Sequence, residues 1–266
     1  MKHLLIPFFI LLSINCFSQP QFEIGRGSTL ISLISKDTIW IAADRRVSNK
    51  NAPQSETIKI RGNNNLYYGI AGNALIMSPY NKTDTIFSAF RSMDSIINYQ
   101  KDLSKCFISF NDYAVSNLTA ILQSMEIKFP KQFASLFQIE DDNFLEFFIC
   151  SFRDNKKYFL SRQLYINGSI KNWSLSKRSA DSSVDIKKVD SGGMLLQPMG
   201  QYNNLYNFLG LKNGYLNRNN IRQRMICLIE EEANKNEFVG MPADLLILSN
   251  NKAEWLYNNK ACVIKE

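Results

Sequence analysis

The stretch "GSTLISLISKDTIWIAADRRVS", residues 27–48, decides the fold of this chain. It contains two runs of β-branched and apolar residues, 28–35 and 38–44, with a Lys-Asp pair between them. Two such runs around a short polar break predict a β-hairpin. A Gly and two hydroxyl residues open the stretch, and Asp44 follows Ser28 by sixteen positions. Ser28 is therefore either an ordinary strand residue or a nucleophile that cleavage after Gly27 would free.

The rest of the chain alternates between strand and helix patterns. A second pair of strands is predicted around the "NNN" turn at 63–65. Apolar residues at three- and four-residue spacing predict helices, and β-rich runs predict further strands. The helices are expected at 83–99, 111–125 and 219–236, the strands at 145–152, 157–168, 243–249 and 253–258, and an irregular insert at 175–191. This order predicts an α+β fold with two antiparallel sheets stacked face to face and helices outside.

The N-terminus has the pattern of a secretory signal peptide. Lys2 precedes an apolar segment, 4–16, and small residues surround an expected cut before Gln19. We therefore expect residues 1–18 to be the signal peptide, 19–27 a short lead-in or propeptide, and 28–266 a single domain. A lipid anchor at Cys16 is the alternative. This apolar segment is too short for a comfortable membrane span, and no other segment approaches eighteen apolar residues. The mature chain is therefore expected to have no membrane span and to be periplasmic or secreted.

The net charge and the histidine content exclude several kinds of binding and catalytic site. The net charge is +7, but Lys and Arg are scattered, which favours a solvated basic surface over a nucleic-acid site. The single histidine, His3, lies in the signal peptide. A mature chain without histidine excludes a Ser-His-Asp triad, a Cys-His pair and His-ligated zinc or haem. We expect no cofactor and no metal.

Four cysteines remain after signal removal: Cys106, Cys150, Cys227 and Cys262. Their wide spacing does not fit a zinc site. An exported chain can form one or two disulfides, whereas Cys150 and Cys227 lie in apolar contexts that equally suit buried free thiols.

Several motifs in one register make the chain resemble a proteasome subunit, within the N-terminal-nucleophile hydrolase superfamily. "GS" supplies a hydroxyl at Ser28, "AADRR" supplies Asp44, "ETIKI" supplies Lys59, and "GIAGNA" supplies Gly72. The segment "NEFVGMPADLLILS", 236–249, resembles the family's late glycine turn and the strand after it. The resemblance implies a four-layer αββα sandwich, a peptide or amide substrate, and stacked homo-oligomers.

The resemblance also implies a role for each matched residue. Ser28 would be the nucleophile, with its own free α-amine as the base, since an α-amine titrates near about pH 8. Lys59 would lower the pKa of the hydroxyl, Asp44 would orient Lys59, and the Gly72 N–H would stabilise the oxyanion. Ile70 would line the specificity pocket.

The chain departs from the family at several positions. The family's nucleophile in this branch is Thr, and Gln201, Asn236 and Val239 stand where it has Ser, Asp and Ser. The family's non-catalytic subunits keep the Gly-hydroxyl pair uncut within a strand. The alternative is therefore a catalytically inactive protein of the same fold, with a binding or assembly role.

Overall fold

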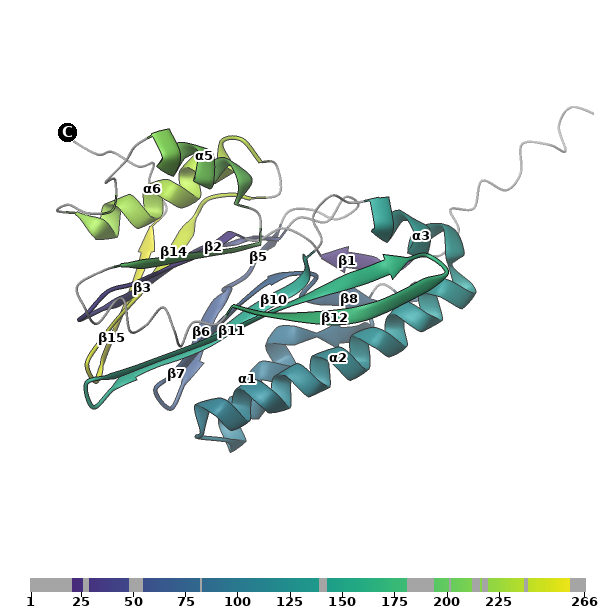
Figure 1. Cartoon of the computed structure of the whole chain (residues 1–266), viewed down its shortest axis with the longest axis horizontal. Coiled ribbons are helices and arrows are strands. Elements are labelled where there is room, and N and C mark those ends of the chain that lie inside the picture. The colour runs from purple at the N-terminus through teal and green to yellow at the C-terminus, as the bar shows by residue number, and fades with distance from the viewer. Residues whose placement is uncertain are drawn as a thin grey trace, which may run out of the picture.

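A computed structural model describes most of the chain: residues 21–25, 29–47, 55–81, 83–138, 143–180, 194–200, 202–211, 216, 220–236 and 239–258. The described residues form a mixed α and β structure with two five-stranded antiparallel sheets. Helices lie along both of these sheets (Figure 1). The predicted α+β class with two antiparallel sheets is confirmed.

Sheet I contains the opening hairpin. Its strands, in spatial order, are β13 (Leu195–Gly200), β2 (Thr29–Ile34), β3 (Ile39–Asp44), β14 (Ala243–Ser249) and β15 (Lys252–Asn258). Strands β2 and β3 pair antiparallel, and the Ser35 N–H donates to the Thr38 carbonyl across the turn that joins them. All six residues of β2 are buried, because both faces of the sheet are covered.

Sheet II is built on three central strands and two edges. In spatial order the strands are β12 (Asn172–Ala180), β11 (Lys156–Ser169), β10 (Asn143–Arg153), β7 (Leu66–Gly72) and β6 (Ile60–Asn63). Asn64 and Asn65 have positive φ in the turn between β6 and β7, as the "NNN" motif predicted. Part of the segment expected to be irregular is strand β12, because its backbone pairs with β11 along its whole length.

Two smaller sheets complete the strand set. One contains β1 (Glu23–Gly25), β8 (Leu75–Met77) and β9 (Thr85–Ser88) in that spatial order. The other pairs β4 (Arg46–Val47) with β5 (Ser55–Glu56). Strand β9 occupies residues that were expected to be helical.

The helices within the described residues are α1 (Ala89–Tyr99), α2 (Leu103–Lys128), α3 (Pro130–Ser135) followed by the 3₁₀ turn η1 (Leu136–Gln138), α5 (Asn203–Leu211) and α6 (Ile221–Ala233). Helix α1 begins after Ser88, whose side chain accepts a hydrogen bond from the Arg91 N–H. The helix thus begins later than the expected start at residue 83. Asp102 caps α2 by accepting from the Lys105 N–H.

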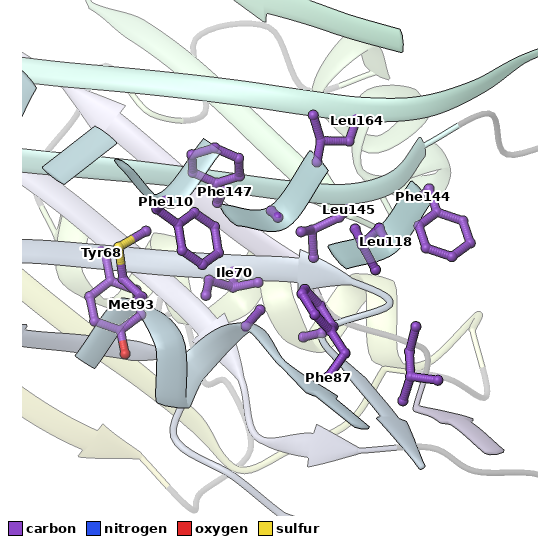
Figure 2. Close-up of a cluster of buried hydrophobic side chains, with 14 of the residues drawn as sticks. Tyr68, Ile70, Phe87, Met93, Phe110, Leu118, Phe144, Leu145, Phe147 and Leu164 are labelled. Atoms are coloured by element: carbon purple, nitrogen blue, oxygen red, sulfur yellow. The ribbon is translucent and has the colours of Figure 1, made fainter. Parts of the chain in front are cut away.

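Three apolar clusters hold these elements together. The first packs helices α1 and α2 on sheet II (Figure 2), the second fills the space between the sheets, and the third packs α5 and α6 on sheet I. Strand β2 serves two of them: Leu30 and Ile34 lie between the sheets, and Ile31 and Leu33 face the helices. This two-sided burial explains why β2 is apolar throughout instead of alternating.

Helix α2 shows how packing selects one face. Phe110, Ala114 and Leu118 are fully buried in the first cluster, at a spacing of four residues. Tyr113, three residues after Phe110 on the same helix, is 36% exposed. Among the described residues no helix is long and apolar enough to span a membrane.

Candidate active site

Asp44 lies at the end of β3, next to the first residue of β2. Its side chain is fully buried, although a carboxylate is normally found at the surface. The backbone N–H of Thr29 donates to Asp44 Oδ1 at 2.7 Å. The carboxylate is therefore fixed at the end of sheet I where β2 begins.

Lys59 meets this carboxylate from the other sheet. It directly precedes β6 of sheet II, is 1% exposed, and places Nζ 2.8 Å from Asp44 Oδ1. The same Nζ donates to the carbonyl oxygen of Arg46, two residues beyond Asp44. The structure thus brings together the two charged residues predicted for the site, in what we call the Asp44–Lys59 pair.

A turn far along the chain closes over Asp44. The Gly240 N–H donates to Asp44 Oδ2 at 3.4 Å, and the Arg46 guanidinium donates to the Val239 carbonyl at 3.3 Å. A Cβ at Gly240 would lie 2.6 Å from Nε of Arg46, so only glycine fits there without a shift. Sequence reasoning identified this glycine turn but missed that it reaches the carboxylate.

Burial dominates the electrostatics of the pair. It raises the pKa of the Asp44 carboxyl, against the opposing effects of Lys59 and of the Thr29 and Gly240 N–H donors. It also lowers the pKa of the Lys59 ammonium, against the attraction of Asp44. Both shifts follow from the cost of holding a charge away from water. The arrangement therefore supplies a cation that gives up its proton more readily than a surface lysine.

Gly72 ends β7 of sheet II, with φ of +83°. A Cβ there would lie 2.8 Å from the Phe144 carbonyl oxygen. Asn73 N–H donates to that same oxygen, so Gly72 and Leu145 form a non-hydrogen-bonded pair and the Gly72 N–H points away from β10. This N–H is directed to the side of β7 on which β6 pairs, and Lys59 immediately precedes β6.

Ile70 does not have the position that its expected role requires. It is fully buried in the first cluster, beneath helices α1 and α2, and Figure 2 shows it near Phe110, Phe147 and Leu145. The side chain is a core residue, because alternate residues of β7 face the helices.

Two expected site residues, Ser28 and Gln201, lie outside the described residues, as does Gly27. Asn236 is described. Its side-chain amide donates to Glu232 Oε1 at 3.4 Å, and its carbonyl accepts from the Val239 N–H. Asn236 therefore belongs to the turn that carries Gly240 to Asp44.

The cysteines that the structure describes are either buried free thiols or disulfide-bonded. Cys106 and Cys150 are free and buried, whereas Cys227 is disulfide-bonded. Burial raises the pKa of the Cys106 thiol to about 11, which disfavours the reactive thiolate. Within the described ranges no group of three or more His, Cys, Asp or Glu side chains is placed to hold a metal ion.

Comparison with known proteins gives structural neighbours only. No protein-family model and no curated protein matches the chain. The Anbu (Gly-1) mutant from Hyphomicrobium sp. strain MC1 aligns at 12% identity over 87% of each chain, with a TM-score of 0.49. Anbu from Yersinia bercovieri, an ancestral beta-subunit, aligns at 11% identity over 87% of this chain and 88% of its own, with a TM-score of 0.47.

These findings correct the family assignment. The chain was expected to be a proteasome-subunit-like member of the N-terminal-nucleophile hydrolase superfamily. That assignment is wrong, because no family model matches and the structural neighbours align at 11–12% identity with TM-scores below 0.5. Likeness at this level assigns neither a family nor an activity, so any function has to be argued from the site itself.

Proposed function

We propose that this protein hydrolyses an amide or peptide bond, with Ser28 as the nucleophile once the Gly27–Ser28 bond has been cut. The observation that carries the proposal is the Asp44–Lys59 pair. Lys59 Nζ and the Thr29 N–H meet on one carboxylate oxygen, at 2.8 and 2.7 Å. The Thr29 nitrogen is the nitrogen of the Ser28–Thr29 peptide bond, so the pair lies beside the residue that would react.

The burial of the pair favours a catalytic over a purely structural role. Removing two charges from water costs several kcal/mol per ion, and apolar residues of similar size often stabilise a core at least as well. Titratable groups with perturbed pKa values cluster at functional sites for this reason.

The proposed reaction needs no histidine. The Ser28 hydroxyl attacks the substrate carbonyl carbon while its proton passes to the free α-amine of the same residue. The amine then protonates the leaving nitrogen as the carbon–nitrogen bond breaks, which leaves an ester on Ser28. A water molecule attacks that ester and gives its proton to the α-amine. The bond between the acyl carbon and the Ser28 oxygen then breaks, the amine returns the proton to that oxygen, and the acid is released.

The other residues have supporting roles in this scheme. The positive charge of Lys59 favours loss of the hydroxyl proton, and Asp44 holds Lys59 in place. The Gly72 N–H would donate to the oxygen that becomes negative during each attack. Its direction away from β10 supports this role.

Export and layer order are part of the same proposal. Residues 1–18 would be removed as a signal peptide near Ser18, giving a periplasmic or secreted protein. The disulfide at Cys227 supports this, because disulfides persist in oxidising compartments. The layers would run α1 and α2, sheet II, sheet I, α5 and α6, as the three apolar clusters suggest.

The test is the intact mass of protein recovered from the exporting cell. The proposal expects a chain that begins at Ser28, and a Ser28→Ala variant that begins upstream. Ser32→Ala is the matched control, because Ser32 is a buried hydroxyl of strand β2 and not part of the site. A wild-type chain that always begins at Gln19 would refute the hydrolase.

That outcome would favour the second candidate, an uncut protein with a binding or assembly role. The observation in its favour is that residues 21–25, upstream of the expected cut, are integrated into the fold through strand β1.

A further inference from the structure

Residues 21–25 are the described part of the expected lead-in and are called the lead-in segment below. They are anchored by an aromatic side chain. Phe22 is only 7% exposed, and its ring packs edge-on against Phe129 at 5.1 Å between centroids. The side-chain amide of Gln132 forms two hydrogen bonds with the Phe22 backbone. Gln132 Oε1 accepts from the Phe22 N–H at 3.0 Å, and Gln132 Nε2 donates to the Phe22 carbonyl at 2.7 Å.

The lead-in segment also adds a strand to a sheet edge. Strand β1 pairs antiparallel with β8, from Glu23 opposite Met77 to Gly25 opposite Leu75. Strand β9 occupies the other side of β8, so β1 is the only described strand on this edge. Figure 1 shows β1 beside β8 and near α3, which carries Gln132. A side-chain anchor with main-chain pairing is how extended peptides bind to sheet edges.

The segment leads from this anchor to the Asp44–Lys59 pair. Leu75, opposite Gly25, lies three residues after Gly72. Three residues lie between Gly25 and Thr29, whose N–H binds Asp44, so four Cα–Cα steps hold the two Cα atoms at most about 14 Å apart. A peptide bound in this way therefore runs toward the site.

We propose that the Phe22 seat, formed by Phe129, Gln132 and the edge of β8 with which β1 pairs, is a binding site for an extended peptide with an aromatic side chain. The lead-in segment occupies it until the chain is cut. As a statement about substrate, this rests on the proposed function. It assigns an aromatic residue to the sixth position before the scissile bond, because Phe22 is the sixth residue before the Gly27–Ser28 bond.

The binding test avoids the chemistry of Ser28. The full chain carries Ser28→Ala and a recognition sequence for a site-specific protease in place of residues 26–27. After external cutting, a fluorescent peptide of residues 19–25 is added in excess and followed by anisotropy and native mass spectrometry. We expect saturable exchange with the cut segment, and binding at least tenfold weaker for the Phe22→Ala peptide.

Protein variants provide matched controls for the same measurement. Gln132→Ala should weaken peptide binding severalfold, because the two hydrogen bonds to the Phe22 backbone are lost. Gln123→Ala, on the exposed face of α2, should leave peptide binding unchanged. A cut segment that never exchanges, or a Phe22→Ala peptide that binds as tightly as its parent, would overturn the proposal.

A second measurement separates the two proposals. Wild-type protein that begins at Ser28 is given peptides with Phe or Ala at the sixth position before a scissile bond. We expect the Phe peptide to have the higher kcat/KM, mainly through a lower KM. If exchange succeeds but neither peptide is cut, the hydrolase is refuted and the binding site stands. Equal kcat/KM for the two peptides would refute the seat as a substrate site.

Discussion

Lys59 and Asp44 come from different sheets and meet in the interior, with Nζ 2.8 Å from Oδ1. Asp44 ends strand β3 of sheet I, and Lys59 lies just before β6 of sheet II. The contact therefore ties the two sheets together at the end of the molecule where β2 begins. This ion pair between the sheets lies beside the second apolar cluster, which fills the space between them.

Breaking this pair on one side should be costly. Lys59→Met leaves the Asp44 carboxyl buried without its cation, and the expected loss is about 3–5 kcal/mol in the free energy of unfolding. The double variant Asp44→Asn/Lys59→Met should recover much of that loss, because no uncompensated charge remains. Urea unfolding measures both, with Lys105→Met on the exposed face of α2 as the control. A double variant as unstable as Lys59→Met would contradict the expectation.

The loss should also depend on pH. Without Lys59, burial raises the pKa of Asp44 even further above its unfolded value of about 3.9. The folded state then binds more protons than the unfolded state at any pH between those two pKa values. Stability must therefore fall as pH rises through that window. The difference between wild type and Lys59→Met should be small near pH 4 and grow toward pH 7. A difference that is constant with pH would show that Asp44 does not carry it.

Gly240→Ala tests the turn that closes over Asp44. The new Cβ would lie 2.6 Å from Nε of Arg46, so the turn or the guanidinium must move. The Arg46 side chain can move at the cost of its hydrogen bond to the Val239 carbonyl, so we expect a loss of about 1 kcal/mol in the free energy of unfolding and slower cutting at Gly27–Ser28. Arg46→Ala in the same chain should restore part of the stability, since it removes the side chain that clashes. The absence of any such restoration would place the clash elsewhere.

The orientation of helix α2 can be tested by a matched pair. Leu118 is fully buried, and Ile127 of the same helix is 79% exposed. Leu118→Ala should lower the free energy of unfolding by about 2–5 kcal/mol, because a cavity remains under the helix. Ile127→Ala should change it by less than about 0.5 kcal/mol. Thermal and urea unfolding would reveal a reversed order, which would mean that the helix is rotated.

Local patterns predicted the opening hairpin and the turn at Asn64–Asn65 well. Polar or Asn-rich breaks between β-branched runs leave the backbone few other conformations. They failed where pairing partners decided the outcome. Strand β9 lies in a helix-like segment because its backbone pairs with β8, and β12 lies in a polar segment because it pairs with β11.

The predictions for the site residues also succeeded in part and failed in part. Asp44, Lys59 and Gly72 were identified as candidates, and the structure places the two charged ones in contact. Ile70 was assigned to a pocket and is a core residue, because the face of β7 that it occupies is covered by helices. The family assignment also depended on local motifs, and comparison over the whole chain did not support it.

By itself the sequence determined the strand-rich start, the candidate charged residues and the presence of a single histidine at position 3, since these depend on residue type and short spacing. Only the tertiary structure decided which groups share the Asp44 carboxylate. Its donors are Thr29 and Lys59, each fifteen residues away, and Gly240, 196 residues away. No local pattern encodes the Gly240 contact, because it exists only when β14 pairs with β3 and brings the preceding turn onto Asp44. The docking of Phe22 on Gln132, 110 residues apart, has the same origin.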